Sequence, residues 1–463
     1  MVFSSIEFII FFLIVVLVLY FNPFFKSRKF KNIILFLSSL VFYAWGEPIY
    51  IFLLLLSILI NFFLGLAIDK KKGKMRKILL ILDLIYNIGI LFIFKYLVFT
   101  LSNIAFLFNK ECHLEIALPI GISFFTFQII SYIIDVYKEK LPVQKNIIHL
   151  GLYISMFPQL VAGPIVRYET VADEIVNRKE TWDQFTKGLY RFIYGLAKKV
   201  LIANNIALLA DSAFSSTELS VASSWLGAIA YTLQIYFDFS GYSDMAIGLG
   251  LMFGFHFNEN FNYPYIAKSV TDFWRRWHIS LSTWFRDYIY IPLGGNRVKK
   301  SRWILNLLAV WLLTGIWHGA NWTFILWGLF YFSILITEKL TNFPQKLGFL
   351  SHIYTMVIVI LAWVMFRAND IASGFRYIGY MFGIHSSGIF DSTALTYLSQ
   401  FKIYLIIGII ASLPIKKYFD DKISKKQSSI YYYFEGIYIS TIFIICIANL
   451  LASSYNPFIY YNF

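Results

Sequence analysis

The chain has 463 residues, of which 59% are hydrophobic and 14% are charged. Soluble domains average about 45–50% apolar and about 25% charged residues, so this composition excludes a soluble enzyme, a disordered chain and a disulfide scaffold. Lysine and arginine exceed aspartate and glutamate by 40 to 26, which leaves a net charge of +14. In a membrane chain this excess favours basic cytoplasmic loops over a nucleic-acid partner.

Apolar stretches long enough for membrane helices follow one another along the chain. A spanning helix needs about 20 mostly apolar residues, and residues 7–25 form the first such stretch. We interpret it as a span, not a signal peptide, because it lacks a basic start and a small-residue cleavage site. Residues 225–256 are long enough for two helices, or for one helix and a re-entrant piece. We expect roughly 11–14 membrane helices, and the other candidates are 33–45, 49–68, 78–99, 118–137, 147–163, 189–213, 303–318, 322–338, 353–366, 403–415 and 431–452.

Basic loops set the expected orientation. Two crossings separate the loop after the first span from the loop after the third, so both lie on one side, which the positive-inside rule makes cytoplasmic. The N-terminus is then expected outside. The clusters are Lys26, Arg28, Lys29 and Lys31; Lys70, Lys71, Lys72, Lys74, Arg76 and Lys77; Arg297, Lys299, Lys300 and Arg302; and Lys416, Lys417, Lys422, Lys425 and Lys426.

No internal repeat, low-complexity tract or flexible linker divides the chain. We therefore predict a single integral membrane domain over residues 1–463, with a core motif region at 120–330 and C-terminal helices at 350–463. The two cysteines, Cys112 and Cys446, are too few and too far apart for a metal or redox motif. The sequence has no P-loop, G-x-S-x-G or H-E-x-x-H motif either, and we predict no metal site.

The hydrophobic pattern breaks down at residues 258–302, which begin NENFNYPYIAKSVTDFWRRWHISLSTWFRDYIYIPLGGNR. A surface loop is the alternative, but the stretch is rich in aromatic residues and lies between hydrophobic spans. Helical spacing places Trp274, His278, Leu281 and Ser282 on one face. Polar helices at membrane depth are tolerated only when they are buried in protein or line a wet cavity. We interpret the stretch as a re-entrant or buried amphipathic helix that lines a polar tunnel.

The next span, residues 303–320, ends in GIWHGANW. His318 lies about 16 residues beyond Arg302, or roughly 24 Å at 1.5 Å per residue, so it is expected deep in the membrane or toward its outer side. An ionisable residue inside a membrane is a functional candidate. A lone histidine on an apolar helix is also often a satisfied core group, and the residues alone leave both interpretations open. Gly315 and Gly319 are expected to leave room for a substrate beside His318.

A second polar seam, FDFSGYSDMAIG, holds Asp238 and Asp244 within an apolar stretch. Two carboxylates at membrane depth need partners, and Arg275, Arg276 and Arg286 are the expected donors. We interpret the seam as a structural ion-pair network in preference to direct chemistry. The Gly248-Leu249-Gly250 run that follows is expected to be a helix-packing feature, not a nucleotide loop.

Taken together, these motifs resemble the membrane-bound O-acyltransferase family, and more closely its bacterial alginate O-acetylation branch. The resemblance covers most of the chain, although little after about Arg367 matches. The segments that carry it stand in the family's order: SFFTFQIISYIIDVY at 123–137, FPQLVAGPIVRY at 157–168, FDFSGYSDMAIGLG at 237–250, DFWRRWHISLSTWFRDYIYIPLGGNR at 272–297 and WHGANW at 317–322.

The resemblance implies an all-α integral membrane protein whose helices and short re-entrant helices surround a central tunnel. It also implies a reaction: transfer of a short acyl group, acetyl in the first instance, to the hydroxyl of a glycan outside the bacterial cytoplasmic membrane. The donor is expected to be acetyl-CoA or another cytoplasmic acyl thioester, with no bound cofactor. An exported hydrolase-fold partner is expected to complete the transfer.

The family's catalytic histidine maps onto His318, and its second conserved polar position maps onto His278. We expect His318 to take a proton from the attacking hydroxyl, as a neutral imidazole can near pH 7. His278 is expected to polarise the thioester carbonyl, stabilise the oxyanion or position the acceptor. The residues expected to line the tunnel or bind substrate are Asp238, Asp244, Asp272, Trp274, Arg275, Arg276, Ser282, Arg286 and Trp317.

Two other functions remain open at this point. A related family activity is D-alanylation of teichoic acid, in which the donor is a thioester of a carrier protein. A function of another class is a transporter that moves an acyl donor or glycan without chemistry, since a polar tunnel suits that as well. Transporters often contain internal repeats, and none is visible here.

Overall fold

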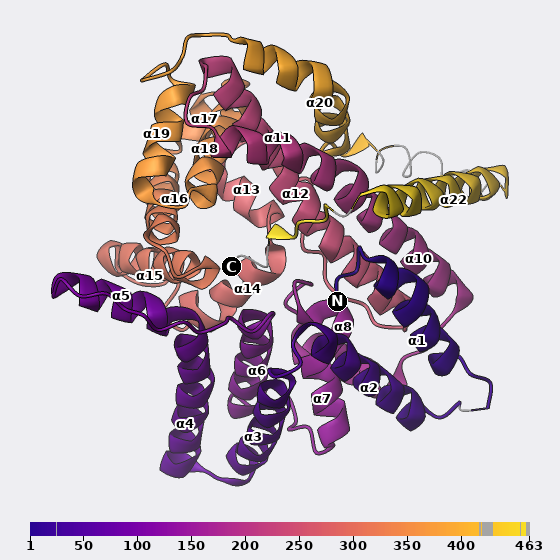
Figure 1. Ribbon diagram of the computed structural model, residues 1–463. Coiled ribbons are helices and arrows are strands. Elements are labelled where there is room, and N and C mark those ends of the chain that lie inside the picture. Colours follow the sequence, from indigo (N-terminus) through magenta and orange to yellow (C-terminus); the bar gives the residue numbers. More distant parts are fainter. Residues whose placement is uncertain (25, 416–417, 419–428, 454, 460–463) are drawn as a thin grey trace. The chain divides into compact units, whose positions relative to one another are not determined.

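The computed structural model of the chain consists of helices, with no β-strand in the part that it describes (Figure 1). It describes residues 1–463 except 25, 416–417, 419–428, 454 and 460–463, and for residues 429–432 it describes the backbone alone. Of the basic cluster predicted at Lys416, Lys417, Lys422, Lys425 and Lys426, every residue lies outside the described part. The helical architecture confirms the predicted all-α class.

The chain forms two compact units, and each is described by itself. Residues 1–192 and 243–258 make up the first unit, and residues 193–242 and 259–463 make up the second. The division into two units is based on the contacts within each part. It does not decide whether residues 1–463 are a single domain, which stays a prediction.

The first unit holds the N-terminal helices. Short π-helical turns, labelled η1 and η2, interrupt two of its long apolar helices. Its elements are η1 (Glu7–Phe12), α1 (Leu13–Tyr20), α2 (Arg28–Gly46), α3 (Ile51–Lys70), α4 (Gly73–Leu91), η2 (Phe92–Tyr96), α5 (Leu97–Leu107), α6 (Ile122–Tyr137), α7 (Ile147–Ser155), α8 (Phe157–Leu160), α9 (Tyr168–Asn177) and most of α10 (Trp182–Ala197).

The second unit holds both predicted catalytic histidines. Its elements are η3 (Lys198–Ala203), α11 (Asn204–Ser215), α12 (Val221–Met252) as far as Tyr242, η4 (Pro264–Ile266), α13 (Val270–Arg276), α14 (Ile279–Phe285), η5 (Arg286–Tyr290), α15 (Lys300–His318), α16 (Trp322–Thr341), α17 (Phe343–Lys346), α18 (Leu350–Arg367), α19 (Ile371–Met381), α20 (Ser392–Ala411) and α22 (Ser429–Ala452).

Seven helical stretches in the described residues are long and apolar enough to cross a membrane. Exposed apolar side chains line them: Phe52 is 71% exposed, Ile85 63% and Ile444 67%. Leaving such groups in water costs about 25 cal/mol per Å² of apolar surface, so lipid covers them in a membrane. Two shorter apolar helices, Glu7–Tyr20 and Ile122–Tyr137, fall below that length, and the predicted 11–14 crossings stay a prediction. The seven are Ile51–Lys70, Gly73–Leu107, Trp182–Ser215, Trp322–Thr341, Leu350–Arg367, Ser392–Ala411 and Tyr433–Ala452.

The prediction that residues 225–256 form two helices, or a helix and a re-entrant piece, is wrong. α12 is one continuous helix of 32 residues, roughly 48 Å long at 1.5 Å per residue. Its small residues let other helices approach closely. A Cβ at Gly248 would lie 2.5 Å from the carbonyl oxygen of Gly188, which confirms that Gly248 is a helix-packing residue.

α15 and α16 form a tight antiparallel hairpin, and the glycines beside His318 belong to its seam. A Cβ on Gly315 would lie 2.4 Å from the carbonyl oxygen of Phe324, and one on Gly319 would lie 2.3 Å from the Phe324 ring. The expectation that these glycines make room for a substrate is therefore wrong, because α16 occupies that space. Gly315 and Gly319 are four residues apart, the spacing that lets two membrane helices pack closely.

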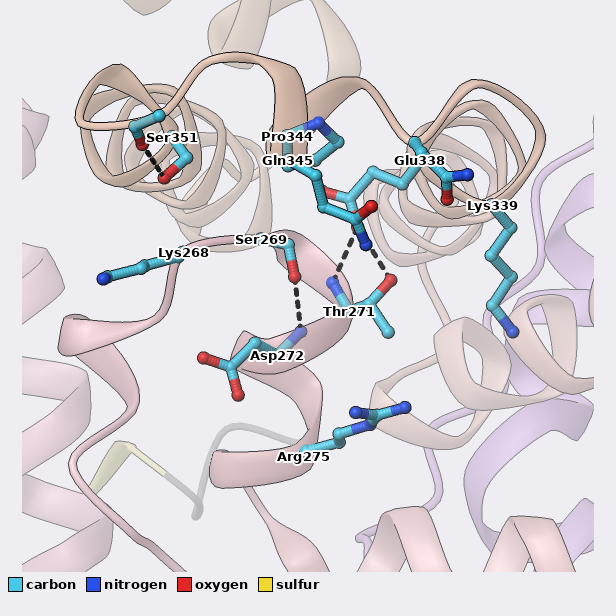
Figure 2. Close-up of a pocket in the computed structure, with 12 residues that line it drawn as sticks. Lys268, Ser269, Thr271, Asp272, Arg275, Glu338, Lys339, Pro344, Gln345 and Ser351 are labelled. Atoms are coloured by element: carbon cyan, nitrogen blue, oxygen red, sulfur yellow. Dashed lines mark hydrogen bonds between the residues drawn. The ribbon is translucent and has the colours of Figure 1, made fainter.

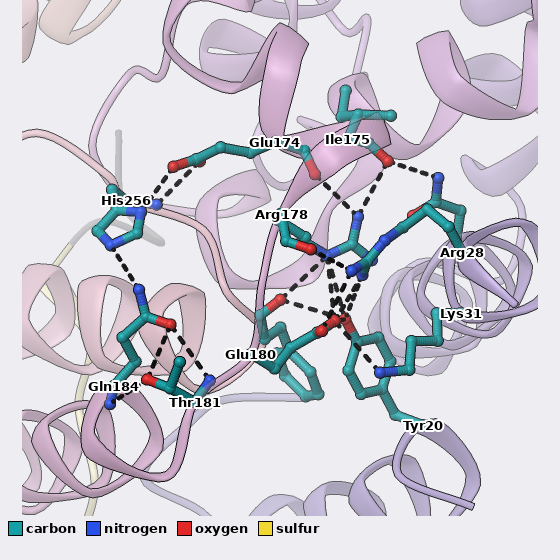
Figure 3. A network of polar contacts seen from close by, with 12 residues as sticks. Tyr20, Arg28, Lys31, Glu174, Ile175, Arg178, Glu180, Thr181, Gln184 and His256 are labelled. Carbon is teal, nitrogen blue, oxygen red and sulfur yellow. Dashed lines mark hydrogen bonds and ion pairs between the residues drawn. The ribbon is translucent and has the colours of Figure 1, made fainter. Parts of the chain in front are cut away.

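In the first unit, Glu180 joins three cationic side chains (Figure 3). It accepts hydrogen bonds from Arg28 at 2.5 Å and from the Tyr20 hydroxyl, and lies 3.4 Å from Lys31 and 3.7 Å from the buried Arg178. Burial opposes ionisation of Glu180, but the hydrogen bonds from Arg28 and Tyr20 outweigh burial and lower its pKa to about 2. The ionised carboxylate therefore holds α1, α2 and the segment before α10 together.

The Gly315 contact predicts that Gly315→Ala destabilises the protein, by about 1–3 kcal/mol, because backbone atoms must move to admit the methyl group. Gly89→Ala is the matched control, since a Cβ at Gly89 meets no atom within 4 Å and alanine is the better helix former. Thermal melting of the purified protein in detergent measures both. Equal or higher melting temperatures for both variants would contradict the close packing of α15 on α16.

The Glu180 network predicts a pH-dependent effect of Glu180→Gln. A depressed carboxylate pKa contributes stability that is present above the unfolded value of 4.5 and is lost as the pH falls toward 2. The variant should melt below wild type at pH 7, and the gap should shrink between pH 4.5 and pH 3. Glu218→Gln, at an exposed loop position, is the control. A gap that stays constant from pH 7 to pH 3 would contradict this assignment.

Candidate active site

The predicted helix through Trp274 and Ser282 is broken at His278. α13 ends at Arg276, α14 begins at Ile279, and His278 between them has φ 43° and ψ 55°, a left-handed conformation. The interpretation that Trp274, His278, Leu281 and Ser282 share one helical face is therefore wrong. Such a backbone costs about 1–3 kcal/mol for a residue other than glycine, and it persists only where surrounding contacts hold it.

Asn260 supplies those contacts from a loop 18 residues earlier in the chain. Its carbonyl accepts the backbone N–H of Ile279 at 2.9 Å, and nearby the N–H of Asn262 donates to the carbonyl of Arg276 at 2.9 Å. The side-chain oxygen of Asn260 accepts the N–H of Ser280 at 3.2 Å and the Ser280 hydroxyl at 2.9 Å. Backbone groups freed by the helix break are thus paired.

The same oxygen determines which nitrogen of His278 carries the proton. Nδ1 of His278 lies 3.1 Å from Oδ1 of Asn260. Because the Ser280 N–H can only donate, the Asn260 atom facing it is an oxygen, so Nδ1 must be the protonated nitrogen. Nε2 then carries the lone pair, and it has no hydrogen-bond partner among the described residues. Burial lowers the pKa of His278 to about 3, which keeps the imidazole neutral.

His318 is the last residue of α15 and is 5% exposed. Its ring lies between aromatic side chains, with centroid distances of 5.1 Å to Trp327, 5.1 Å to Phe366 and 5.0 Å to Trp317. The Trp317 ring is also 5.9 Å from the ring of His278. The two predicted catalytic histidines therefore contact the same indole.

An aromatic cluster continues from His318 toward the other end of α16. Trp327 packs on Tyr331 at 5.0 Å, and Trp274 packs on Tyr331 at 5.0 Å and on Trp311 at 4.9 Å. Trp327 and Tyr331 are fully buried. Of the predicted lining residues, Trp274 and Trp317 belong to this cluster, which keeps bulk water from His318.

The expected partners of Asp238 and Asp244 are wrong. Asp238 pairs with Lys199 at 2.6 Å, with both side chains 3% exposed, and Asp244 pairs with Arg191 at 2.6 Å. The π-helical turn η3 carries Lys199. Lys199 and Arg191 both lie in the apolar stretch at 189–213, which was predicted to span the membrane. A cation inside a membrane span needs a partner, so the sequence did contain a signal that could have identified these two residues.

The C-terminal segment supplies one further partner for each member of the Asp238–Lys199 pair. The N–H of Ile459 donates to Asp238 at 2.8 Å, and Lys199 donates to the carbonyl of Pro457. The ring of Phe458 stacks on Tyr242 at 4.8 Å. Sequence analysis missed this contact, because no pattern near the C-terminus indicates a position beside α12.

The remaining predicted residues divide between local ion pairs and a pocket. Arg276 pairs with Asp272 at 3.0 Å one helical turn away, and Arg286 pairs with its neighbour Asp287 at 2.7 Å, so neither reaches the α12 carboxylates. Ser282 donates to the carbonyl of Trp274 at 3.4 Å.

Asp272 and Arg275 line a pocket of about 620 Å³ between the start of α13 and the segment that joins α16 to α18 (Figure 2). In the described part of the chain, no group of three or more His, Cys, Asp or Glu side chains could hold a metal ion.

Comparison with known proteins matches the sequence to one family. The profile of MBOAT, the membrane-bound O-acyltransferase family, matches residues 42–376. A protein of Pseudomonas aeruginosa named "Probable alginate O-acetylase AlgI" is 41% identical over 438 residues, which cover 92% of this chain and 84% of that protein.

Two further relatives carry different substrate names. The peptidoglycan O-acetyltransferase of Helicobacter pylori is 38% identical, over 78% of this chain and 75% of that protein. The teichoic acid D-alanyltransferase of Bacillus subtilis is 34% identical, over 49% of this chain and 60% of that protein. With the family profile spanning most of the chain, the protein is an O-acyltransferase that belongs to the membrane-bound O-acyltransferase family.

Proposed function

We propose that the protein transfers an acetyl group from a cytoplasmic thioester donor for O-acetylation of a glycan outside the cytoplasmic membrane. The observation that carries this proposal is the 41% identity to an alginate O-acetylase across 92% of the chain. Acetyl-CoA or another acyl thioester is the donor, and an exopolysaccharide or cell-wall polymer is the acceptor. The N-terminus lies outside, and an exported hydrolase-fold protein completes the transfer.

His318 is the general base in this proposal. Its imidazole removes the proton as the acceptor oxygen attacks the thioester carbonyl, and a tetrahedral intermediate forms. The carbon–sulfur bond then breaks, the thiolate leaves, and the proton passes from His318 to the sulfur. The aromatic rings around His318 support this role, because excluding water suppresses hydrolysis of the thioester.

His278 acts on the acceptor in this proposal, not on the oxyanion. Because the Nδ1–H group donates to Asn260, the other ring nitrogen, Nε2, carries a lone pair. Nε2 can therefore accept a hydrogen bond but cannot donate one. Of the roles expected for His278, positioning the acceptor is therefore the one that the hydrogen bonds support. Its Nε2 accepts from a second hydroxyl of the glycan, because the proton of the attacking hydroxyl goes to His318. Polarising the carbonyl or stabilising an oxyanion requires a donor.

D-alanine transfer is the second candidate. The identity to a teichoic acid D-alanyltransferase supports it, but over about half of this chain. The alginate and peptidoglycan relatives match 78% of the chain or more, which favours acetate. Because the chain is an O-acyltransferase, transport without chemistry is not proposed further.

His318→Ala is expected to lower glycan acetylation by about 100-fold or more, since general-base catalysis contributes about 10²–10⁴-fold. Cells that lack the native gene are complemented with wild type, His318→Ala or His113→Ala, all at equal protein level. His113 is the control, because its side chain is 86% exposed. Base-labile acetate and D-alanine are quantified separately. Normal glycan acetylation by His318→Ala would contradict the mechanism. Loss of D-alanine esters instead of acetate esters would identify D-alanine transfer, the second candidate, as the function.

Asn260 is expected to act as a positioning residue for His278. Asn260→Leu removes the acceptor and should lower kcat strongly. Asn260→Asp keeps it and should retain activity, but a carboxylate beside the imidazole raises the pKa of His278. The acidic limb of the pH–rate profile should then move to higher pH. Equal activities and identical pH profiles for both variants would contradict the assignment of the tautomer.

A further inference from the structure

A carboxyl group lies buried among the apolar helices of the first unit. Asp83 belongs to α4, which packs on α3 and α6 (Figure 1), and its side chain is 0% exposed. It lies 10 residues beyond Gly73, the first residue of the apolar stretch Gly73–Leu107, or about 15 Å along the helix. The hydrocarbon core of a bilayer is about 30 Å thick, which places Asp83 near the middle of that core.

Amide side chains connect this carboxyl to the neighbouring helix. Asn87, one turn further along α4, donates from Nδ2 to Oδ2 of Asp83 at 3.0 Å. Asn87 and Asn61 of α3 exchange hydrogen bonds, at 2.9 Å from Asn87 and at 3.2 Å from Asn61. Asn61 also donates to the carbonyl of Ser57 at 2.8 Å. The carboxyl therefore ends a polar chain that joins α4 to α3 inside the membrane.

No cation neutralises Asp83 in the described part of the chain, and its second oxygen, Oδ1, has no hydrogen-bond partner there. Another buried aspartate of the first unit does have a cation, because Asp135 lies 3.3 Å from Lys140. The ionisable side chains that interact electrostatically with Asp83 are Tyr86 on the same helix and Tyr132 of α6. Both are phenols, which are neutral at pH 7, so neither supplies a counter-charge.

The free energy of burial then determines the protonation state of this carboxyl. An unpaired carboxylate in an apolar interior loses its hydration and gains no counter-charge, which costs far more than one neutral hydroxyl without a partner. A protonated carboxyl keeps the hydrogen bond from Asn87, because its carbonyl oxygen still accepts. The packing of α4 on α3 and α6 therefore suits the acid better than its anion.

We propose that Asp83 is a proton-binding site inside the membrane, where Oδ1 carries a proton at neutral pH and loss of that proton loosens the packing of α4 on α3 and α6. The site takes no part in the acyl transfer proposed above. An aspartate of the unfolded chain is ionised at pH 7, so the folded protein binds one proton more than the unfolded chain. Raising the pH should therefore lower the free energy of unfolding.

Infrared spectroscopy of the purified full-length protein in nanodiscs detects the proton directly. A protonated carboxyl has a C=O stretching band that a carboxylate lacks. Wild type at pH 7 should show such a band that Asp83→Asn lacks. Asp69→Asn, at an exposed position near the end of α3, is the matched control and should retain the band. Identical acid bands in wild type and Asp83→Asn would overturn the proposal.

Thermal melting at several pH values gives a second readout. Asp83→Asn keeps an acceptor for Asn87 and cannot ionise, so the gap between its melting temperature and that of wild type should widen in its favour as the pH rises from 5 to 9. Asp69→Asn should show no such trend. A gap that stays constant, or that moves in favour of wild type, would contradict the assignment.

A measurement on wild type alone covers the case in which Asp83→Asn does not fold. Protein labelled with carboxyl-¹³C aspartate should show a protonated-aspartate band at pH 7, shifted by the isotope. Absence of any such band would overturn the proposal without use of a variant.

Discussion

The hydrogen bonds of Asn260 hold open a break between two short buried helices, and the geometry around both histidines depends on that break. Without them, residues 270–285 have the composition to continue as one helix, and His278 would lie on its surface. With them, His278 takes a left-handed backbone and turns its ring against Phe239 at 4.7 Å and Trp317 at 5.9 Å. Asn260 therefore holds the backbone at the break through both its carbonyl and its side chain, and its side-chain oxygen determines the tautomer of His278.

The second unit contains a buried ion pair. Asp238 and Lys199 neutralise each other at 2.6 Å in a setting that is almost fully buried. Removing either partner of such a pair leaves an uncompensated charge and is strongly destabilising. Arg275 and Lys339 are exposed, and the nearby carboxylates hold the first turn of α13 and pair with Arg276.

Sequence analysis predicted what depends on local pattern. The apolar length of α15 placed His318 at the end of that helix. It failed where the deciding partner lies far along the chain. Asn260 is 18 residues from the break that it stabilises, and Lys199 and Arg191 lie on other helices than the carboxylates that they pair with. Gly315 was misread because a glycine beside a histidine can make room for a substrate or for a helix, and only the position of α16 decides between them.

The central claim is that His318 is the general base for acyl transfer from a thioester donor. The most direct measurement is a cryo-EM structure of the protein with a non-hydrolysable acetyl thioether of coenzyme A. The account predicts density for the acetyl carbonyl beside His318. A donor bound with its acetyl group remote from His318 would contradict it.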